Sequence, residues 1–283
     1  MAATLRSARL YFWPIILANV VAMTIGAGGD VRRMAWFSLV LSSQASFGFL
    51  VNDLCDRRID RVNRAGHFEH SPRPTLILAR VTASVLCVGS LALAWALGPG
   101  AWMIAVSLAI GLAAYSRVLR RAEVLPNVAG AVFASAPLWA PLVLALSGGA
   151  RWQWWLVAAV VVLLTAREML MDVRDRRGDA AGGRKTLATQ RGARAAIRVG
   201  VGLTATGLVP FCVAVLVRPS TVSPTSTAAA AAVATVIALL LVIPAWSILS
   251  RAADGTAIRS YVLRSRLAMA LLPVLSLLLS SPV

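Results

Sequence analysis

The chain has 283 residues, of which 59% are hydrophobic and 14% are charged, and its mean hydropathy is +0.77. A soluble domain carries about 25% charged residues, so this composition excludes an ordinary soluble protein and indicates one integral membrane domain over residues 1–283. The net charge is +17, carried by 27 arginines and a single lysine. Because these cations fall between apolar runs, membrane orientation and anionic lipid headgroups explain them, and we expect no nucleic-acid partner.

Nine apolar runs of membrane-spanning length follow one another along the chain. We therefore expect an all-α, polytopic membrane protein with nine transmembrane helices. The runs cover roughly 11–29, 35–54, 75–97, 101–118, 125–147, 153–171, 196–217, 227–249 and 261–279. The first run ends in small residues, as a signal peptide does, but its apolar core is long for one, so we expect a retained helix.

Arginines concentrate in alternate connectors between these runs. The connectors after the second, fourth, sixth and eighth runs hold most of them, whereas the opposite connectors hold few. The positive-inside rule therefore predicts a cytoplasmic N-terminus and a C-terminus outside. The arginine-rich, lysine-poor composition is typical of GC-rich bacteria, so the expected location is a bacterial cell membrane.

Six of the 11 acidic residues gather in two short stretches. The first stretch, at the end of the second run and just beyond it, holds Asn52, Asp53, Asp56 and Asp60. The second stretch, just beyond the sixth run, holds Asp172, Asp175 and Asp179. Both stretches space their aspartates i, i+3, i+7, which places the three carboxylates on one face of a helix. Both stretches fall on the side that the arginines mark as cytoplasmic.

An acid at the centre of a membrane helix costs about 2.5–3.5 kcal/mol, so six acids predict a shallow, water-filled mouth with divalent cations bound between the two stretches. Carboxylates, waters and phosphate oxygens are the ligands that hold Mg²⁺. We interpret the pair as a clamp for Mg²⁺ and a diphosphate, with Asn52 as an extra oxygen donor. Solvated helix ends paired with arginines would explain one stretch alone equally well, but repetition in the same register favours the clamp.

The motifs resemble those of a known family, the UbiA family of membrane prenyltransferases. Its first signature is similar to Asn52-Asp53-x-x-Asp56-x-x-x-Asp60, followed by Asn63 and Arg73-Pro74. Its second is similar to Arg167-Glu168-x-x-x-Asp172-x-x-Asp175-x-x-x-Asp179, followed by Lys185-Thr186-Leu187. Its Tyr-x-x-x-Lys element is similar to Tyr115-Ser116-x-x-Leu119-Arg120-Arg121, where Arg120 replaces the usual lysine. The resemblance extends over the whole chain.

The resemblance implies a UbiA-like bundle around a central cavity that opens to membrane lipids and is capped by the two motifs. It also implies a Mg²⁺ cofactor and a polyprenyl diphosphate substrate, whose diphosphate leaves to form an allylic cation. By this resemblance Asp53, Asp56, Asp172 and Asp175 are catalytic, and Asn52, Asp60 and Asp179 complete the metal set. The implied diphosphate contacts are Asn52, Arg73, Tyr115, Arg120 and Lys185. Orientation at the membrane surface explains Arg73 and Arg120 equally well.

A few polar or aromatic residues within the runs are candidates for the acceptor site or the cavity wall. They are Asn19, Gln44, Phe49, Asn127 and Glu168. Hydrogen bonds between helices are the simpler interpretation for the amides, and pairing with Arg167 is the simpler one for Glu168. Phe49 could steady a cation through its ring, but packing explains it as well.

Three functions remain open on the residues alone. The preferred one is transfer of a prenyl group to an aromatic or lipid-like acceptor. The second is a UbiA-type terpene cyclase, in which the substrate's own double bonds attack the cation. A cation transporter is more distant, because transport sites lie near the bilayer midplane on interrupted helices. The residues leave open the donor chain length, acceptor identity, regiochemistry and oligomeric state.

Overall fold

The computed structural model describes residues 1–63, 68, 70–117, 122–145, 149–217, 222–250 and 255–280. Helices account for the regular structure of this part of the chain. In order they are α1 (Ala2–Ala8), the short 3-10 helix η1 (Leu10–Phe12), α2 (Trp13–Gly26), α3 (Val31–Cys55), α4 (Arg57–Asn63), α5 (Arg73–Leu97), α6 (Pro99–Arg117), α7 (Leu125–Ala134), α8 (Ala136–Leu144), α9 (Arg151–Ala181), α10 (Leu187–Gln190), α11 (Ala193–Leu216), α12 (Pro224–Ser250) and α13 (Gly255–Ser280).

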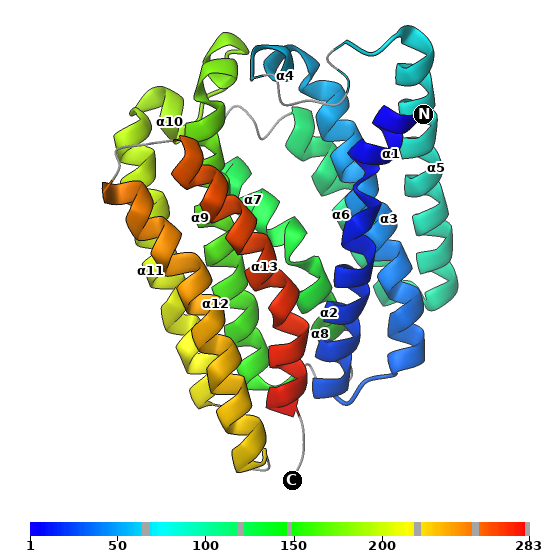
Figure 1. The fold of residues 1–283 in the computed structure, drawn as a ribbon. Helices are drawn as coiled ribbons and strands as arrows, with labels where there is room; N and C mark the ends of the chain where they lie inside the picture. The colour runs from blue at the N-terminus through cyan, green and yellow to red at the C-terminus, as the bar shows by residue number, and fades with distance from the viewer. Residues whose placement is uncertain are drawn as a thin grey trace.

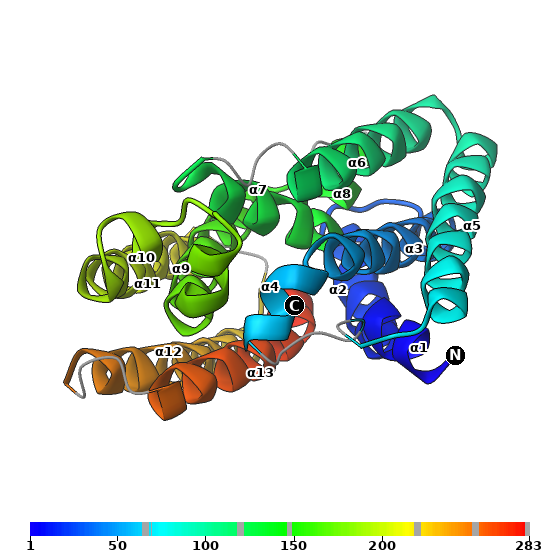
Figure 2. The same cartoon turned by 90° about the horizontal axis from the view of Figure 1, so that it is seen from above.

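The long helices form a ring (Figures 1 and 2). On one side α3 packs against α2, α5 and α6, and on the other α9 packs against α11 while α12 packs against α13. Contacts between α13 and α2 close the ring on one side, and α7, which touches both α6 and α9, closes it on the other. The N-terminus and α4 lie at one end of the bundle, and the C-terminus lies at the opposite end (Figure 1).

Within the described residues, six helices are long and apolar enough to cross a membrane, or seven if one bent pair counts as a single span. The nine expected spans are therefore not all confirmed. The expected run 125–147 is broken at Ser135 into α7 and α8, which meet at 61°. Pro137, which has no backbone N–H, follows the break, and the indole of Trp139 donates to the carbonyl oxygen of Val132 at 2.9 Å. Broken helices persist in membranes where freed backbone groups find such partners.

The sixth expected run differs in length. The helix that contains it, α9, has 31 residues and continues past the predicted end at residue 171. The polar residues of the second acidic motif therefore extend the same helix beyond its apolar part. The fourth run corresponds to α6, whose apolar portion is Pro99–Tyr115 and is shorter than the six candidate spans.

Helices α2, α9 and α13 converge tightly at the end of the bundle that lies away from the motifs. A Cβ atom on Gly26 would lie 2.5 Å from Ser280 Oγ and 2.8 Å from Gln153 Nε2, so only glycine permits this approach. Gln153 Nε2 donates to the carbonyl oxygen of Met23 at 2.8 Å, and Trp152 is fully buried beside it. These contacts hold the ring together across three helices that are distant in sequence.

The ring encloses a cavity of about 1240 Å³, which we call the central cavity. Apolar side chains from α2, α3, α6, α8, α9 and α13 form most of its wall, including Ile16, Leu41, Leu112, Leu138, Leu164 and Met269. Towards the motif end the wall becomes polar and includes Asn52, Asn63 and Asp175. The cavity thus offers room for an apolar chain beneath a polar mouth, as the resemblance implied.

Candidate active site

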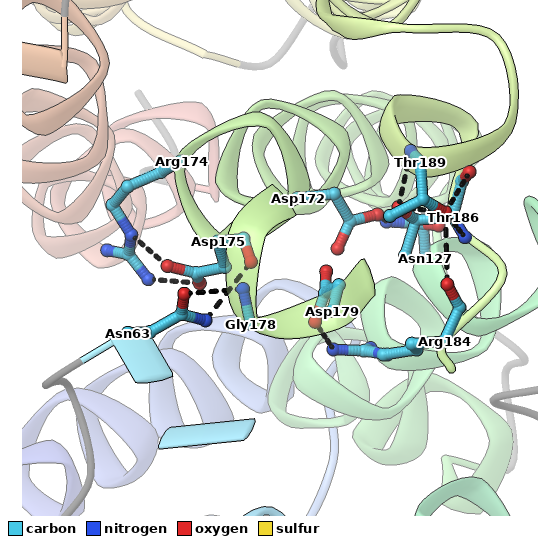
Figure 3. A network of polar contacts seen from close by, with 10 residues as sticks. All are labelled: Asn63, Asn127, Asp172, Arg174, Asp175, Gly178, Asp179, Arg184, Thr186 and Thr189. Carbon is cyan, nitrogen blue, oxygen red and sulfur yellow. Dashed lines mark hydrogen bonds and ion pairs between the residues drawn. The ribbon is translucent and has the colours of Figure 1, made fainter. Parts of the chain in front are cut away.

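The second acidic motif occupies the last turns of α9 (Figure 3). Asn127 Nδ2 donates to Asp172 Oδ2 at 2.8 Å, and Arg184 Nη1 donates to Asp179 Oδ1 at 3.4 Å. Arg174 holds Asp175 with two hydrogen bonds of 2.7 and 2.6 Å. Asp172 and Asp179 therefore point towards the side of Arg184, whereas Asp175 points away from them, towards Arg174 and the central cavity. The three carboxylates thus do not point the same way, as their spacing predicted, because the ion pair with Arg174 directs Asp175 away.

The first motif lies at the junction of α3 and α4, and its first two aspartates are buried. Asp53 Oδ2 accepts from Ser7 Oγ at 2.9 Å, and Asp53 Oδ1 accepts from Arg9 Nη2 at 3.3 Å. Asp56 terminates α3, where its backbone N–H donates to the carbonyl oxygen of Asn52 at 2.9 Å. The N-terminal segment thus covers the first motif and neutralises one of its charges.

Arg9 reaches Asp53 through an uncommon backbone conformation. Its φ is +50°, the only positive φ at a non-glycine residue in the described part of the chain. A left-handed residue with a side chain costs about 1–2 kcal/mol, and such strain is found preferentially at functional sites. Here it turns the chain between α1 and η1 and places the guanidinium 4.2 Å above the ring of Phe49.

The two motifs are joined by α4, which lies above the middle of the ring (Figure 2) and packs against α9. Asn63 Nδ2 donates to the carbonyl oxygen of Asp175 at 3.1 Å, and Asn63 Oδ1 accepts from the backbone N–H of Gly178 at 2.9 Å. A Cβ on Gly178 would collide with the Asn63 side chain, and one on Gly182 would collide with Ile59. Two glycines one turn apart therefore let α4 lie directly on α9.

Arg184 connects the charges of both motifs. Its loop is fixed by Thr189 Oγ1, which donates to the Arg184 carbonyl oxygen at 3.0 Å, and by the cap that Thr186 forms on α10. Burial would lower the pKa of Arg184, but the charges of Asp179, Tyr115, Asp172 and Asp56 outweigh it, so the pKa is raised. This guanidinium therefore stays charged at the point where the two motifs meet.

Asp179 is the most buried acid of the site, with no exposed surface. Burial is the main cause that raises its pKa to about 6; Arg184 opposes the shift, and the charges of Asp175 and Asp56 add to it. Its Oδ2 atom is buried without a hydrogen-bond partner in the described structure. An unpartnered carboxylate oxygen of this kind is a free position for a cation.

The donor set fits Mg²⁺. All the candidate ligands are oxygens, and Asp56 of the first motif lies close enough to Asp179 and Arg184 for its charge to act on both. Within the described residues, no three His, Cys, Asp or Glu side chains already form a metal site. Mg²⁺ does not need such a cage, because it keeps several waters and shares its shell with substrate phosphates.

The remaining predicted diphosphate contacts lie at different places. Tyr115 lines the central cavity, and Asn52 does so from the end of α3. Lys185 is exposed beside Arg184. Arg73 begins α5 and lines a separate shallow hollow with Pro74, Ile77, Leu78 and Val81, outside the central cavity. Arg120 lies outside the described residues.

Four of the five predicted acceptor or cavity residues line the central cavity. Asn19 and Gln44 each have a buried amide oxygen, Oδ1 and Oε1, without a partner in the described structure. Glu168 pairs with Arg167 at 2.6 Å, as the simpler interpretation had it. The ring of Phe49 already carries the Arg9 guanidinium. Asn127 lies away from the cavity wall and donates from α7 to Asp172 on α9, which is the hydrogen bond between helices that the simpler interpretation predicted.

Sequence reasoning missed three residues of the site. Ser7 and Arg9 precede the first apolar run, and nothing in the sequence indicates that they fold back onto Asp53. Arg184 had a usable signal, since it is adjacent to the predicted Lys185, but only the loop conformation shows which of the two basic side chains points inward.

Comparisons with known proteins agree with this geometry. Residues 11–271 match the model of the UbiA prenyltransferase family. A digeranylgeranylglyceryl phosphate synthase of Methanoculleus marisnigri is 33% identical over 204 residues, which cover 70% of this chain and 66% of that protein. One from Halobacterium salinarum is 33% identical over 208 residues, which cover 67% of this chain and 70% of that protein. The chain thus spans about two thirds of the length of these curated relatives.

Solved structures share the fold. A UbiA homologue from Archaeoglobus fulgidus bound to GPP and Mg²⁺ has a TM-score of 0.67 at 17% identity, covering 97% of this chain and 99% of that one. The apo structure of a UbiA homologue from Aeropyrum pernix K1 has a TM-score of 0.69 at 17% identity, covering 93% and 96%. Together with the apolar helices, the family match shows that the chain is an integral membrane protein that belongs to the UbiA prenyltransferase family.

Proposed function

We propose that the protein is a Mg²⁺-dependent prenyltransferase that ionises a polyprenyl diphosphate and transfers the prenyl group to a lipid-like acceptor. The observation that carries the proposal is that Asn63 of α4 is hydrogen-bonded to α9 at Asp175 and Gly178, which brings the two motifs together, and that Asn52 and Asp175 line the polar end of an otherwise largely apolar cavity of about 1240 Å³. The relatives named digeranylgeranylglyceryl phosphate synthase favour a lipid-like acceptor over an aromatic one. By the positive-inside rule, the mouth faces the cytoplasm.

The chain's own residues would contribute to the reaction in three ways. Arg184 and Tyr115 hold positive charge and a hydroxyl near the position of the leaving diphosphate, where preorganised donors stabilise developing negative charge. The apolar wall holds the prenyl chain and excludes water from the allylic cation. Mg²⁺, held by Asp53, Asp56, Asp172, Asp175 and Asp179 with Asn52 and Asp60 nearby, would supply electrophilic stabilisation of the leaving oxygens.

The acceptor needs a partner for its nucleophilic group. Asn19 Oδ1 and Gln44 Oε1 are buried, unpartnered acceptors on the cavity wall in the described structure. A hydroxyl of the acceptor could donate to either oxygen, which would orient its lone pairs towards the cation. An unpaired buried acceptor costs about 1–3 kcal/mol, so binding such a hydroxyl would also recover stability.

The test is diphosphate release by purified protein in nanodiscs, with geranyl, farnesyl or geranylgeranyl diphosphate, with and without Mg²⁺ and lipid acceptors. We expect Asp56→Asn and Asp175→Asn each to abolish release while the protein remains folded. Asp30→Asn is the matched control, because Asp30 caps α3 at the opposite end of the bundle and Asn is an equally good cap. Wild-type release by either motif variant would contradict the clamp.

The same assay separates the alternatives. A terpene alcohol or hydrocarbon formed from the diphosphate alone would identify a cyclase. Cation uptake into sealed vesicles without any diphosphate release would identify a transporter.

A further inference from the structure

Two large side chains on one wall of the central cavity lie directly against glycines of neighbouring helices. Leu112 of α6 packs against Gly48 of α3, where an added Cβ would lie 2.8 Å from Leu112 Cδ2. Phe133 of α7 packs against Gly111 of α6, where an added Cβ would lie 2.5 Å from Phe133 Cζ. Gly48, Leu112 and Phe133 line the cavity. Each large side chain thus occupies the space that a residue other than glycine would need, so it stays back from the centre of the cavity.

An alanine at either glycine would move the facing side chain. Two carbon atoms in contact lie about 3.5–4.0 Å apart, so neither position has room for a methyl group. The backbone of α6 is held by its packing against α3 and α5, whereas the ring of Phe133 can turn about its side-chain torsions. The open space beside this ring is the central cavity, so the displaced ring would enter it.

Both pairs lie deeper in the cavity than the acidic motifs. Phe133 lies six residues after Asn127, which donates to Asp172, so it is about 9 Å along α7 from the level of the second motif. Gly48 lies four residues before Asn52 on α3, or about 6 Å from the level of the first motif. The two pairs therefore border the path of the later units of a prenyl chain, not of its reacting end.

We propose that Gly48 and Gly111 determine the longest prenyl diphosphate that the protein accepts, by keeping Leu112 and Phe133 out of the path of the chain. A dimethylallyl group has three carbon–carbon bonds along its longest path and spans less than about 5 Å, so it ends before it reaches either pair. Farnesyl and geranylgeranyl groups extend past both pairs. The inference rests on the proposed function, since it assigns the donor-length selectivity of the same cavity.

The kinetic test uses Gly111→Ala and Gly48→Ala in nanodiscs. It compares dimethylallyl diphosphate with the longest donor that the wild-type protein uses among geranyl, farnesyl and geranylgeranyl diphosphates. We expect each variant to lower kcat/KM for the long donor relative to the short one by about 10- to 200-fold, the discrimination that a methylene group produces in an apolar pocket. Gly89→Ala on α5 is the matched control, because a Cβ there meets nothing within 4 Å and the residue does not line the cavity in the described structure. It should leave the ratio unchanged.

Variants of Phe133 separate a change in the cavity from a loss of folding. Phe133→Leu shortens the side chain that faces Gly111, so in the Gly111→Ala background it should restore most of the ratio. Phe133→Trp leaves both glycines in place and enlarges the side chain, so it should lower the ratio as Gly111→Ala does. This second variant tests the inference even if Gly111→Ala does not fold.

A binding test does not depend on catalysis. Isopentyl and phytanyl diphosphates, whose saturated chains form no allylic cation, are titrated calorimetrically with Mg²⁺ into the wild-type protein and the same variants. We expect Gly111→Ala to weaken binding of phytanyl diphosphate by about 10- to 200-fold and to leave the affinity for isopentyl diphosphate within about twofold. This result would stand even if no prenyl transfer occurred, so failure of the proposed function is distinguishable.

Three results would overturn the inference. One is an equal loss for short and long donors in Gly111→Ala, which would leave the diphosphate clamp intact and give the glycines a packing role alone. Another is a ratio that Phe133→Leu does not restore. The third is a wild-type protein that uses and binds no chain longer than one prenyl unit.

Discussion

The contact between Asn63 and Gly178 offers the sharpest test of how the two motifs are held together. Asn63→Ala removes both hydrogen bonds that fasten α4 to α9, of 3.1 and 2.9 Å. Each such bond contributes about 0.5–1.5 kcal/mol, so the loss is about 1–3 kcal/mol, or about 5- to 150-fold in the population of the docked arrangement. We expect diphosphate release to fall by a factor in this range.

Gly178→Ala reaches the same contact from the other helix. The added methyl would occupy the position of the Asn63 side chain and displace it, so the same two hydrogen bonds are lost. Alanine also favours the helix by about 1 kcal/mol over glycine, which offsets part of the loss. The double variant should therefore be no worse than Asn63→Ala alone, because the methyl then enters space that the shortened side chain has left.

The assay is a double-mutant cycle on diphosphate release, with thermal unfolding in detergent as the check on folding. Gly202→Ala on α11 is the control, since a Cβ there meets nothing within 4 Å. We expect it to leave release unchanged. If the two single effects multiply in the double variant, the residues act independently, and docking of α4 through this contact is refuted.

Three further perturbations have defined outcomes. Arg184→Gln leaves Asp179 buried without its cation and should slow diphosphate release by about 10- to 100-fold. Lys185→Gln alters an exposed side chain and should slow release less. The reverse order of the two effects would contradict the inward position of Arg184. Arg9→Gln removes a cation that competes with Mg²⁺ for the Asp53 carboxylate, so the Mg²⁺ concentration for half-maximal release should fall. An unchanged Mg²⁺ titration would show that Arg9 does not act on the metal site. Gly26→Ala should lower the free energy of unfolding by about 1–3 kcal/mol through overpacking against Ser280 and Gln153, detectable as a lower melting temperature in detergent with unchanged KM for the prenyl diphosphate.

Local sequence pattern was sufficient where one residue's neighbours along the chain decide its environment. Apolar runs predicted the helices, because a chain in lipid must satisfy its own backbone hydrogen bonds. The same pattern failed to predict where a helix breaks or ends, because hydropathy does not measure backbone geometry. The run 125–147 is uniformly apolar, yet Pro137 and the Trp139 indole make a break at Ser135 stable, and hydropathy does not register either effect. The run 153–171 similarly gave no indication of where α9 ends.

The candidate site divides in the same way. The shared spacing of the aspartates paired the second motif with the first, and it predicted three carboxylates on one face of a helix. It could not predict that Arg174 directs Asp175 away from Asp172 and Asp179. The sequence could not indicate that Asn63 joins the motifs, because that contact spans 112 to 115 residues and depends on the missing side chain of Gly178. Nor could the sequence show that Arg184 points towards the motifs while Lys185 is exposed, because the conformation of the loop sets the direction of both side chains.

The sequence by itself determined that this is a helical membrane protein with two acidic motifs at the ends of its second and sixth apolar runs, because charge and hydropathy are properties of the residues and their order. The tertiary structure alone decided which charges meet. Arg9 and Arg167 are distant in sequence, but they line one cavity because α13 packs against both α2 and α9. Electrostatic interaction depends on distance in space, and helices far apart in sequence set that distance only when they pack.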